Sequence, residues 1–119
     1  ILIPLEPGTV FGVRYVFRRQ VAHSLEKWIV PGGDGDFFYT QDRLFPPTKG
    51  ATRRRTMLFE IPDYLADCVG WWRVQVIGGQ TAYIDQRFFM YDPDQGVPDP
   101  LPEAVAPSPN CLPDAVPDR

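Results

Sequence analysis

The sequence of 119 residues predicts an all-β fold, a sandwich or small barrel of about six or seven short strands. Apolar and polar residues alternate with period two in several segments, and turn signals separate these segments. Residue types are also unevenly distributed, because all 16 aromatic residues lie between Phe11 and Tyr91. We therefore divide the chain into a β-sandwich body, residues 1–91, and an extended, acidic, proline-rich tail, residues 92–119.

Two segments with clear alternation are predicted to be strands. Residues 10–18 form one, and its apolar face consists of Phe11, Val13, Tyr15 and Phe17. Residues 53–61 form the other, with Met57, Phe59 and Ile61 on one face. Because side chains alternate along a strand, we expect Arg53 and Arg55 to share that face and Arg54 to point the other way.

A hairpin is predicted over residues 71–91. The step Gly78-Gly79 separates two β-rich runs, and both glycines can adopt the positive φ that tight hairpin turns require. We expect Trp72, Val74 and Val76 to be buried on one face of the first strand.

The remaining segments give weaker signals. Residues 1–5 fit a short edge strand, residues 37–39 fit a short strand after a flexible loop at 31–35, and residues 63–67 fit one helical turn. Residues 21–30 are ambiguous, since Val21, Leu25, Trp28 and Ile29 match a helical stripe while the end of the segment is β-rich. We favour a turn followed by a strand.

The segment Asp67-Cys68-Val69-Gly70-Trp71 resembles the corner that precedes the second-to-last strand of immunoglobulin-like sandwiches. Its spacing differs by one residue and its aromatic residue is Trp. The resemblance covers about 25 residues and implies an immunoglobulin-like antiparallel β-sandwich. It implies no function, because this fold carries many.

The two cysteines, Cys68 and Cys111, permit one disulfide. The bridge would close a loop of 43 residues, pin the tail to the body, and stabilise the fold by about 4 kcal/mol. Two unrelated thiols are the alternative, and two cysteines do not settle the redox compartment. The chain starts at Ile1 rather than Met, so we expect it to be processed, truncated or numbered from its first ordered residue; a removed signal peptide would explain this start, although no residue of the chain shows one.

The sequence offers no constellation typical of catalysis or of metal binding. His23 is the single histidine, and on a strand the adjacent Ser24 would point to the opposite face. The pair Asp34 and Asp36 lacks the calcium-loop spacing, and no glycine-rich phosphate loop occurs. We therefore expect no enzyme, no cofactor and no metal site, and no run of residues is apolar enough to span a membrane.

Basic residues gather at two places in the body, in the run from Lys49 to Arg55 and around Arg18 and Arg19. They fit three interpretations: a face for single-stranded nucleic acid, a charged strand end that protects a sheet edge, or a receptor for an acidic partner. The body has 11 basic and 9 acidic residues and the whole chain has a net charge of −3, which disfavours nucleic acid.

The tail contains eight of the fourteen prolines, six acidic residues and one basic residue. This composition favours an extended arm, and its isolated apolar residues include Leu101, Val105 and Leu112. An ordered arm needs a surface to bind, so we expect it to contact a neighbouring subunit.

The expected function is therefore a non-enzymatic structural or interaction module of a multi-subunit assembly, with other subunits or copies of itself as partners. Virion decoration or connector proteins and secretion or pilus components fit, in a virion or extracytoplasmic location. A single-stranded nucleic-acid-binding barrel and a cell-envelope carbohydrate- or peptide-binding module, with Trp71 and Tyr83 as stacking residues, are the alternatives. The expected partner-binding residues are Arg18, Arg19, Arg53, Arg54, Arg55, Leu101, Val105 and Leu112.

Overall fold

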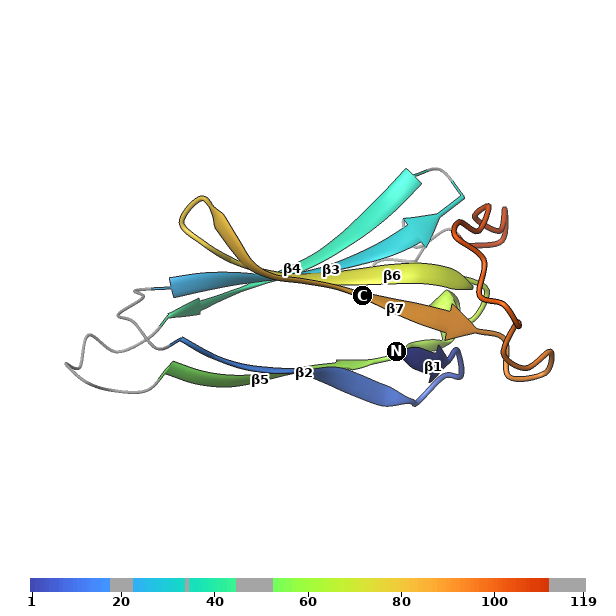
Figure 1. Ribbon diagram of the computed structural model, residues 1–119, viewed down its shortest axis with the longest axis horizontal. Helices are drawn as coiled ribbons and strands as arrows, with labels where there is room; N and C mark the ends of the chain where they lie inside the picture. The colour runs from blue at the N-terminus through green and yellow to red at the C-terminus, as the bar shows by residue number, and fades with distance from the viewer. Residues whose placement is uncertain (18–22, 34, 45–52, 112–119) are drawn as a thin grey trace.

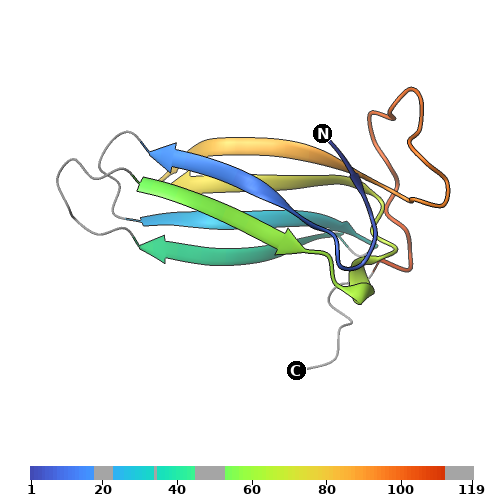
Figure 2. The same cartoon turned by 90° about the horizontal axis from the view of Figure 1, so that it is seen from below.

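The computed structural model describes residues 1–17, 23–33, 35–44 and 53–111, and it shows two β-sheets packed face to face (Figures 1 and 2). The strands are β1 (Leu2–Pro4), β2 (Val10–Phe17), β3 (His23–Gly32), β4 (Gly35–Leu44), β5 (Arg53–Glu60), β6 (Gly70–Gly78) and β7 (Thr81–Tyr91). A single 3-10 turn, η1 (Asp63–Leu65), connects β5 to β6, at the position where the sequence predicts a helical turn.

The larger sheet has five strands in the order β1-β7-β6-β3-β4, and the smaller sheet pairs β2 with β5. The order β7-β6-β3-β4 corresponds to strands G, F, C and C′ of an immunoglobulin-like sandwich, and β2 and β5 correspond to its strands B and E. The predicted all-β fold is confirmed. One detail differs, since β1 runs parallel to β7, which makes the larger sheet mixed rather than antiparallel.

The ambiguous segment forms a strand over its described part. β3 covers His23–Gly32 and pairs with both β4 and β6, so long-range hydrogen bonds override its helical stripe. The prediction of a flexible loop at residues 31–35 is wrong for most of that segment, because β3 extends to Gly32 and β4 begins at Gly35. Gly32 pairs with Gly35, and β4 continues to Leu44, well beyond the short strand predicted at 37–39.

The hairpin of β6 and β7 is confirmed, and its turn lies one residue later than predicted. Gly78 pairs with Thr81, so the turn residues are Gly79 and Gln80. Only Gly79 has a positive φ, 62°, as the first turn position of a type II′ hairpin requires. Trp72, on the inner face of β6, is fully buried, and so are Val74 and Val76.

Aromatic rings from both sheets form the centre of the core. Phe11 of β2 lies 5.2–6.0 Å, between ring centroids, from Trp28, Phe59, Trp72 and Phe88. The ring of Phe11 meets the rings of Trp28 and Phe88 edge to face. This arrangement stabilises aromatic pairs by more than their burial alone. The indole of Trp72 also donates a 2.8 Å hydrogen bond to the carbonyl oxygen of Cys68.

Gly12 allows β2 and β5 to approach closely. A Cβ atom at this position would lie 2.0 Å from the carbonyl oxygen of Met57 and 2.9 Å from a methyl carbon of Leu58. Real Cβ contacts are longer than 3.0 Å, so any larger residue would push β5 away from β2.

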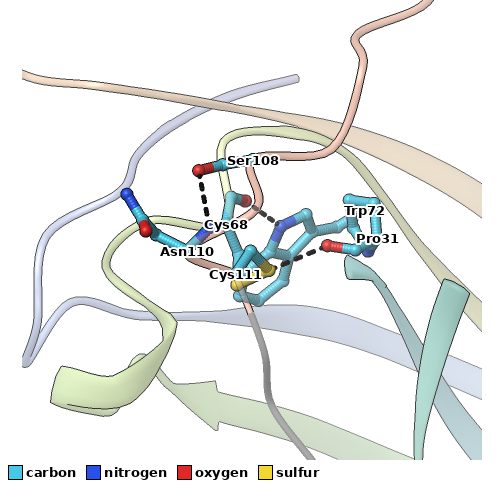
Figure 3. Close-up of a disulfide and its surroundings, with 6 residues drawn as sticks. All are labelled: Pro31, Cys68, Trp72, Ser108, Asn110 and Cys111. Atoms are coloured by element: carbon cyan, nitrogen blue, oxygen red, sulfur yellow. Dashed lines mark hydrogen bonds between the residues drawn. A yellow bond between two sulfur atoms is a disulfide. The ribbon is translucent and has the colours of Figure 1, made fainter. Parts of the chain in front are cut away.

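A disulfide joins Cys68, which precedes β6, to Cys111 of the tail (Figure 3). Both residues are fully buried. The sulfur of Cys111 lies 2.9 Å from the carbonyl oxygen of Pro31, and the amide of Gly33 donates a 2.7 Å hydrogen bond to the carbonyl oxygen of Cys111. Residues 92–111 contain no helix or strand, and the bridge anchors their end in the core of the body.

Candidate functional site

A carboxylate lies inside the sandwich. The alternation along β3 directs Ser24, Glu26, Trp28 and Val30 towards the smaller sheet, and Glu26 is only 2% exposed. An unpaired carboxylate in this position would strongly destabilise the fold, so its partners define the site.

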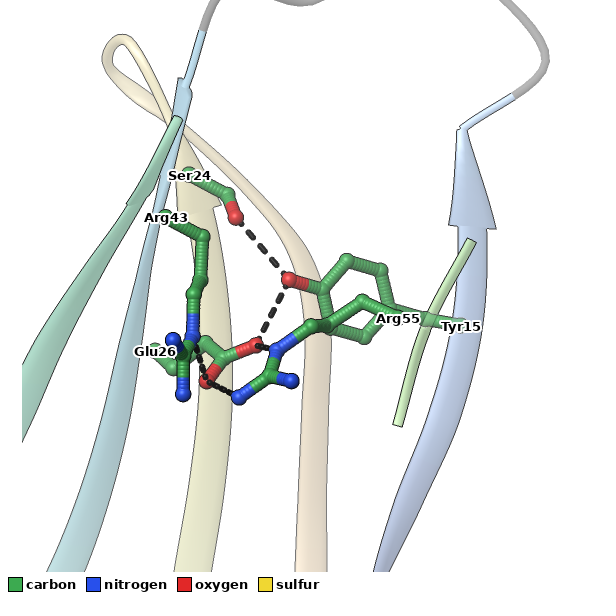
Figure 4. Close-up of polar contacts among 5 residues, drawn as sticks. All are labelled: Tyr15, Ser24, Glu26, Arg43 and Arg55. Carbon is green, nitrogen blue, oxygen red and sulfur yellow. Dashed lines mark hydrogen bonds and ion pairs between the residues drawn. The ribbon is translucent and has the colours of Figure 1, made fainter. Parts of the chain in front are cut away.

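Four residues lie around Glu26 (Figure 4). They come from four strands, and one of these strands is β3, which also carries Glu26. Arg55 of β5 donates from Nε to one carboxylate oxygen at 3.0 Å and from a terminal nitrogen to the other at 3.5 Å. Arg43 of β4 pairs through Nε at 3.4 Å. The hydroxyl of Tyr15, on β2, donates to Glu26 at 2.8 Å and lies 2.9 Å from the hydroxyl oxygen of Ser24.

This Glu26 network links the two sheets and carries a net positive charge, since two guanidinium groups face one carboxylate. Burial, together with the nearby Glu26 carboxylate, raises the pKa of Tyr15 to about 12 against the opposing effects of Ser24 and Arg55. The phenol therefore remains protonated at neutral pH and acts as a donor to Glu26.

A cavity of about 570 Å³ borders the network. It is lined by Arg14, Tyr15, Val16, Arg54, Arg55, Thr56 and Ile84, and no acidic side chain is among these described residues. Arg55 is held by Glu26, whereas Arg14 and Arg54 make no ion pair with any described residue. We call this hollow the arginine cavity. Two of the three arginines that line it, Arg14 and Arg54, therefore carry positive charges that no described carboxylate balances.

The outer face of the smaller sheet continues from this cavity. Val16 lies opposite Arg54, and Gly12 lies opposite Leu58, so these side chains occupy one face. Val10, Val16 and Leu58 are 52%, 43% and 64% exposed. Among the described residues, β2 and β5 pair only with each other, which leaves both edges of this sheet open.

The predicted arginine run divides as expected on β5. Arg55 turns inward on the face of Met57 and Phe59, and Arg54 is exposed on the opposite face. The backbone of Arg53 pairs with Phe17, and its side chain lies outside the described part of the structure. Arg18 and Arg19 also lie outside the described residues, so the run and this pair are not shown to form one patch.

Of the predicted tail residues, Leu101 and Val105 lie within the described structure. Val105 packs beside Gly70 of the same chain, since a Cβ atom on Gly70 would lie 3.5 Å from Cβ of Val105. Leu101 is 37% exposed, and Leu112 lies outside the described residues. Contact between the tail and a neighbouring subunit stays a prediction.

Glu26, Tyr15 and Arg43 were not singled out as site residues from the sequence. The available signal was a glutamate between Ser24 and Trp28 on the face that β3 turns inward. A charged residue in that position of a buried face requires partners, but the sequence does not reveal which distant strands supply them.

The described residues contain no cluster of the side chains that usually bind metal ions. None of their His, Cys, Asp and Glu side chains gather in threes around a position where a metal ion would fit. His23 is exposed while Ser24 is buried, so the two side chains lie on opposite faces of β3. Within the described ranges, no helix has the length and apolar character needed to cross a membrane.

The sequence matches no protein-family model, and no curated protein or solved structure shows significant similarity to the chain. Its function is therefore inferred from the geometry described above.

Proposed function

We propose that the protein is a non-enzymatic interaction module of an extracytoplasmic or virion assembly, and that its smaller sheet binds an extended acidic segment of a neighbouring subunit. The observation that supports this proposal is the arginine cavity, where Arg14 and Arg54 lie without a described carboxylate partner beside Arg55, which Glu26 binds. Burying such a cluster against another protein requires a partner with negative charge.

The positions of the arginines suggest the spacing of the acidic groups. Arg14 pairs with Thr56 and Val16 with Arg54, so Arg14 and Arg54 are diagonal neighbours on one face. Diagonal positions in a sheet are separated by about 7–8 Å. Alternate residues of an extended segment lie about 6.6 Å apart and point the same way, so two carboxylates at positions i and i+2 match the two arginines.

Apolar contacts and backbone groups supply the rest of the interaction. Each of Val10, Val16 and Leu58 would contribute up to about 1.5–3 kcal/mol on full burial. An extended segment at an open edge of β2 or β5 would add main-chain hydrogen bonds, as in β-strand addition. The disulfide supports an oxidising location, because such bridges persist in secreted, periplasmic and virion proteins.

The two alternative functions have less support. Single-stranded nucleic acid would need exposed aromatic rings beside the arginines, and Tyr15 is buried with its hydroxyl bound to Glu26. A carbohydrate site at Trp71 and Tyr83 would need open ring faces. The guanidinium of Arg87 covers one face of Trp71 at 4.0 Å, whereas Tyr83 makes an edge contact with Phe17 and is 42% exposed, so only Trp71 counts against this alternative.

Peptide binding tests the proposal. A fluorescent peptide with alternating Asp and Val should bind, and the same peptide with Asn in place of Asp should not. Arg54→Gln should weaken binding about tenfold, the effect of losing one charge-assisted hydrogen bond. Arg54→Glu should also weaken subunit association in native mass measurements while leaving Tm almost unchanged, since Arg54 is exposed.

Arg73→Gln is the matched control, because Arg73 is exposed on the larger sheet and pairs with Asp85. Equal binding of the Asp and Asn peptides, or no effect of Arg54→Gln, would contradict the proposal. Tighter binding of a single-stranded oligonucleotide, with a steep dependence on salt, would favour the nucleic-acid alternative instead.

A further inference from the structure

A second cavity, of about 180 Å³, lies between the two sheets on the side of β4 and β5. β4 is an outermost strand of the larger sheet, and β3 and β5 supply the other described residues that line the cavity. We call it the β4–β5 slot. Its lining differs from that of the arginine cavity, because Arg55 is the only described residue that lines both.

The charged groups of the slot gather at one end. Glu26 on β3 lies opposite Gln41 on β4, and Arg43 is two residues further along β4 on the same face. Arg55 of β5 contacts the Glu26 carboxylate from the facing sheet. Figure 4 shows this carboxylate between the guanidinium groups of Arg43 and Arg55.

Aromatic rings line the other end. Trp28 lies opposite Tyr39 in the pairing of β3 with β4. The ring of Phe59, from β5, lies 5.3 Å from that of Trp28 and 5.5 Å from that of Tyr39, between centroids. Trp28 follows Glu26 by two residues on β3, and alternate residues of a strand lie about 6.6 Å apart. The charged end and the aromatic end are therefore one such step apart.

The charged end has an excess of positive charge. Glu26 balances one of the two guanidinium groups, and among the described residues no other carboxylate lines the slot. Arg43 reaches Glu26 through Nε alone, at 3.4 Å, and no described residue accepts a hydrogen bond from its terminal nitrogens. Its side chain is only 31% exposed, so these donors are partly shielded from water. A second carboxylate at this end would balance the charge and accept their hydrogen bonds.

The volume of the slot limits the size of a ligand. Liquid water takes about 30 Å³ per molecule, so the slot has room for about six water molecules. Pockets for drug-sized ligands are larger, at roughly 300–1,000 Å³. A molecule the size of one substituted aromatic ring fits this range, with a carboxylate for the charged end and an apolar body for the aromatic end.

We propose that the β4–β5 slot binds a small aromatic carboxylate. The carboxylate contacts Arg43 and Arg55 beside Glu26, and the ring packs against the aromatic end of the slot. This inference does not rest on the proposed function, which concerns the arginine cavity and an acidic segment of a neighbouring subunit.

A nuclear magnetic resonance titration with phenylacetate tests the proposal. The indole N–H signal of Trp28, assigned by triple-resonance experiments, should shift saturably with a dissociation constant of about 1 mM, because so small a ligand makes few contacts. Phenylacetamide, the neutral isostere, should bind about tenfold more weakly, since it lacks the charge that Arg43 would bind. Absence of a saturable shift, or equal binding of the two compounds, would overturn the proposal.

Two variants locate the ligand in the slot. Arg43→Gln removes one guanidinium while Arg55 still holds Glu26, and it should weaken phenylacetate binding about tenfold. Gln41→Phe should fill the slot and abolish the shift of Trp28. Gln41 is exposed, so this second variant should remain folded even if Arg43→Gln does not.

The matched controls are Arg73→Gln and Gln75→Phe. Both residues lie on the outer face of the larger sheet, where they contact Asp85, and phenylacetate binding should not change. Full binding to Gln41→Phe would place the ligand outside the slot and overturn the proposal. Binding of the acidic peptide without binding of phenylacetate would refute this inference alone, and the reverse result would refute the arginine-cavity proposal alone.

Discussion

The hydroxyl of Tyr15 donates a 2.8 Å hydrogen bond to the carboxylate of Glu26, from the smaller sheet to the larger one. The same carboxylate oxygen accepts a 3.0 Å hydrogen bond from Nε of Arg55. Tyr15 and Glu26 thus fix the position of one of the three arginines that line the arginine cavity. The Glu26 network that joins the two sheets and the proposed binding site therefore share Tyr15 and Arg55.

Removing the charge of Glu26 should strongly destabilise the protein. In Glu26→Gln, Arg43 and Arg55 lose their only carboxylate among the described residues, and we expect the free energy of unfolding to fall by about 3–5 kcal/mol. Urea denaturation measures this change. Asp85→Asn breaks the exposed pair with Arg73 and should cost less than about 1 kcal/mol. Similar losses in the two variants would show that the network is not a buried ion pair.

The raised pKa of Tyr15 predicts a loss of stability at alkaline pH. Its folded-state pKa is about 12 against an ordinary value of 10.0, so between these values the unfolded chain loses the proton while the folded protein keeps it. The unfolded state then binds fewer protons, and stability falls as pH rises through this window. Denaturant titrations from pH 9 to about pH 12 should show a steeper decline for the native protein than for Tyr15→Phe. Parallel declines would mean that Tyr15 does not contribute.

Enlarging Gly12 should separate β2 from β5. Gly12→Ala places a Cβ atom 2.0 Å from the carbonyl oxygen of Met57, and we expect a loss of at least about 2 kcal/mol in the free energy of unfolding. Val16→Ala, on the same exposed face, should change stability by less than about 0.5 kcal/mol. Thermal unfolding followed by circular dichroism compares the two. If Gly12→Ala is as stable as Val16→Ala, β2 and β5 can move apart at Gly12 without loss of stability, and the close approach to Met57 does not require glycine.

Removing the disulfide should destabilise the body and release residues 97–111. The double variant Cys68→Ser, Cys111→Ser opens a loop of 43 residues, and we expect a loss of about 4 kcal/mol. Limited proteolysis should then cut within residues 97–111 before the strands. Deleting residues 93–119 should leave a folded but less stable body, because no aromatic residue is removed. If the truncated chain is unfolded, the division into body and tail at residue 92 is wrong.

Local pattern predicted much of this fold because its strands are amphipathic. The buried stripe of Trp72, Val74 and Val76 and the opposite orientations of Arg54 and Arg55 follow from the two-residue period of a strand. Partners could not be predicted in the same way. Glu26 meets Arg55, 29 residues away, because of how two sheets stack, and alternation carries no information about that distance.

The features that the sequence predicted wrongly or left open have similar physical causes. The length of β4 comes from its pairing with β3 over ten positions, which compensates for the weak β-propensity of residues such as Asp42 and Gln41. The pairing of Cys68 with Cys111 depends on the path by which the tail returns to Pro31 and Gly33. Nothing local to either cysteine specifies that path, so the sequence alone left the bridge undecided.

The bridge between Cys68 and Cys111 also determines how the molecule would respond to mechanical tension. It encloses both β6 and β7, so a pulling force passing along the chain crosses from one cysteine to the other through sulfur and bypasses the hairpin between them. These 43 residues would add about 150 Å of slack to a fully stretched chain, and the covalent bond withholds all of it. While it is intact, the bridge spares the central hairpin of the larger sheet from such a load.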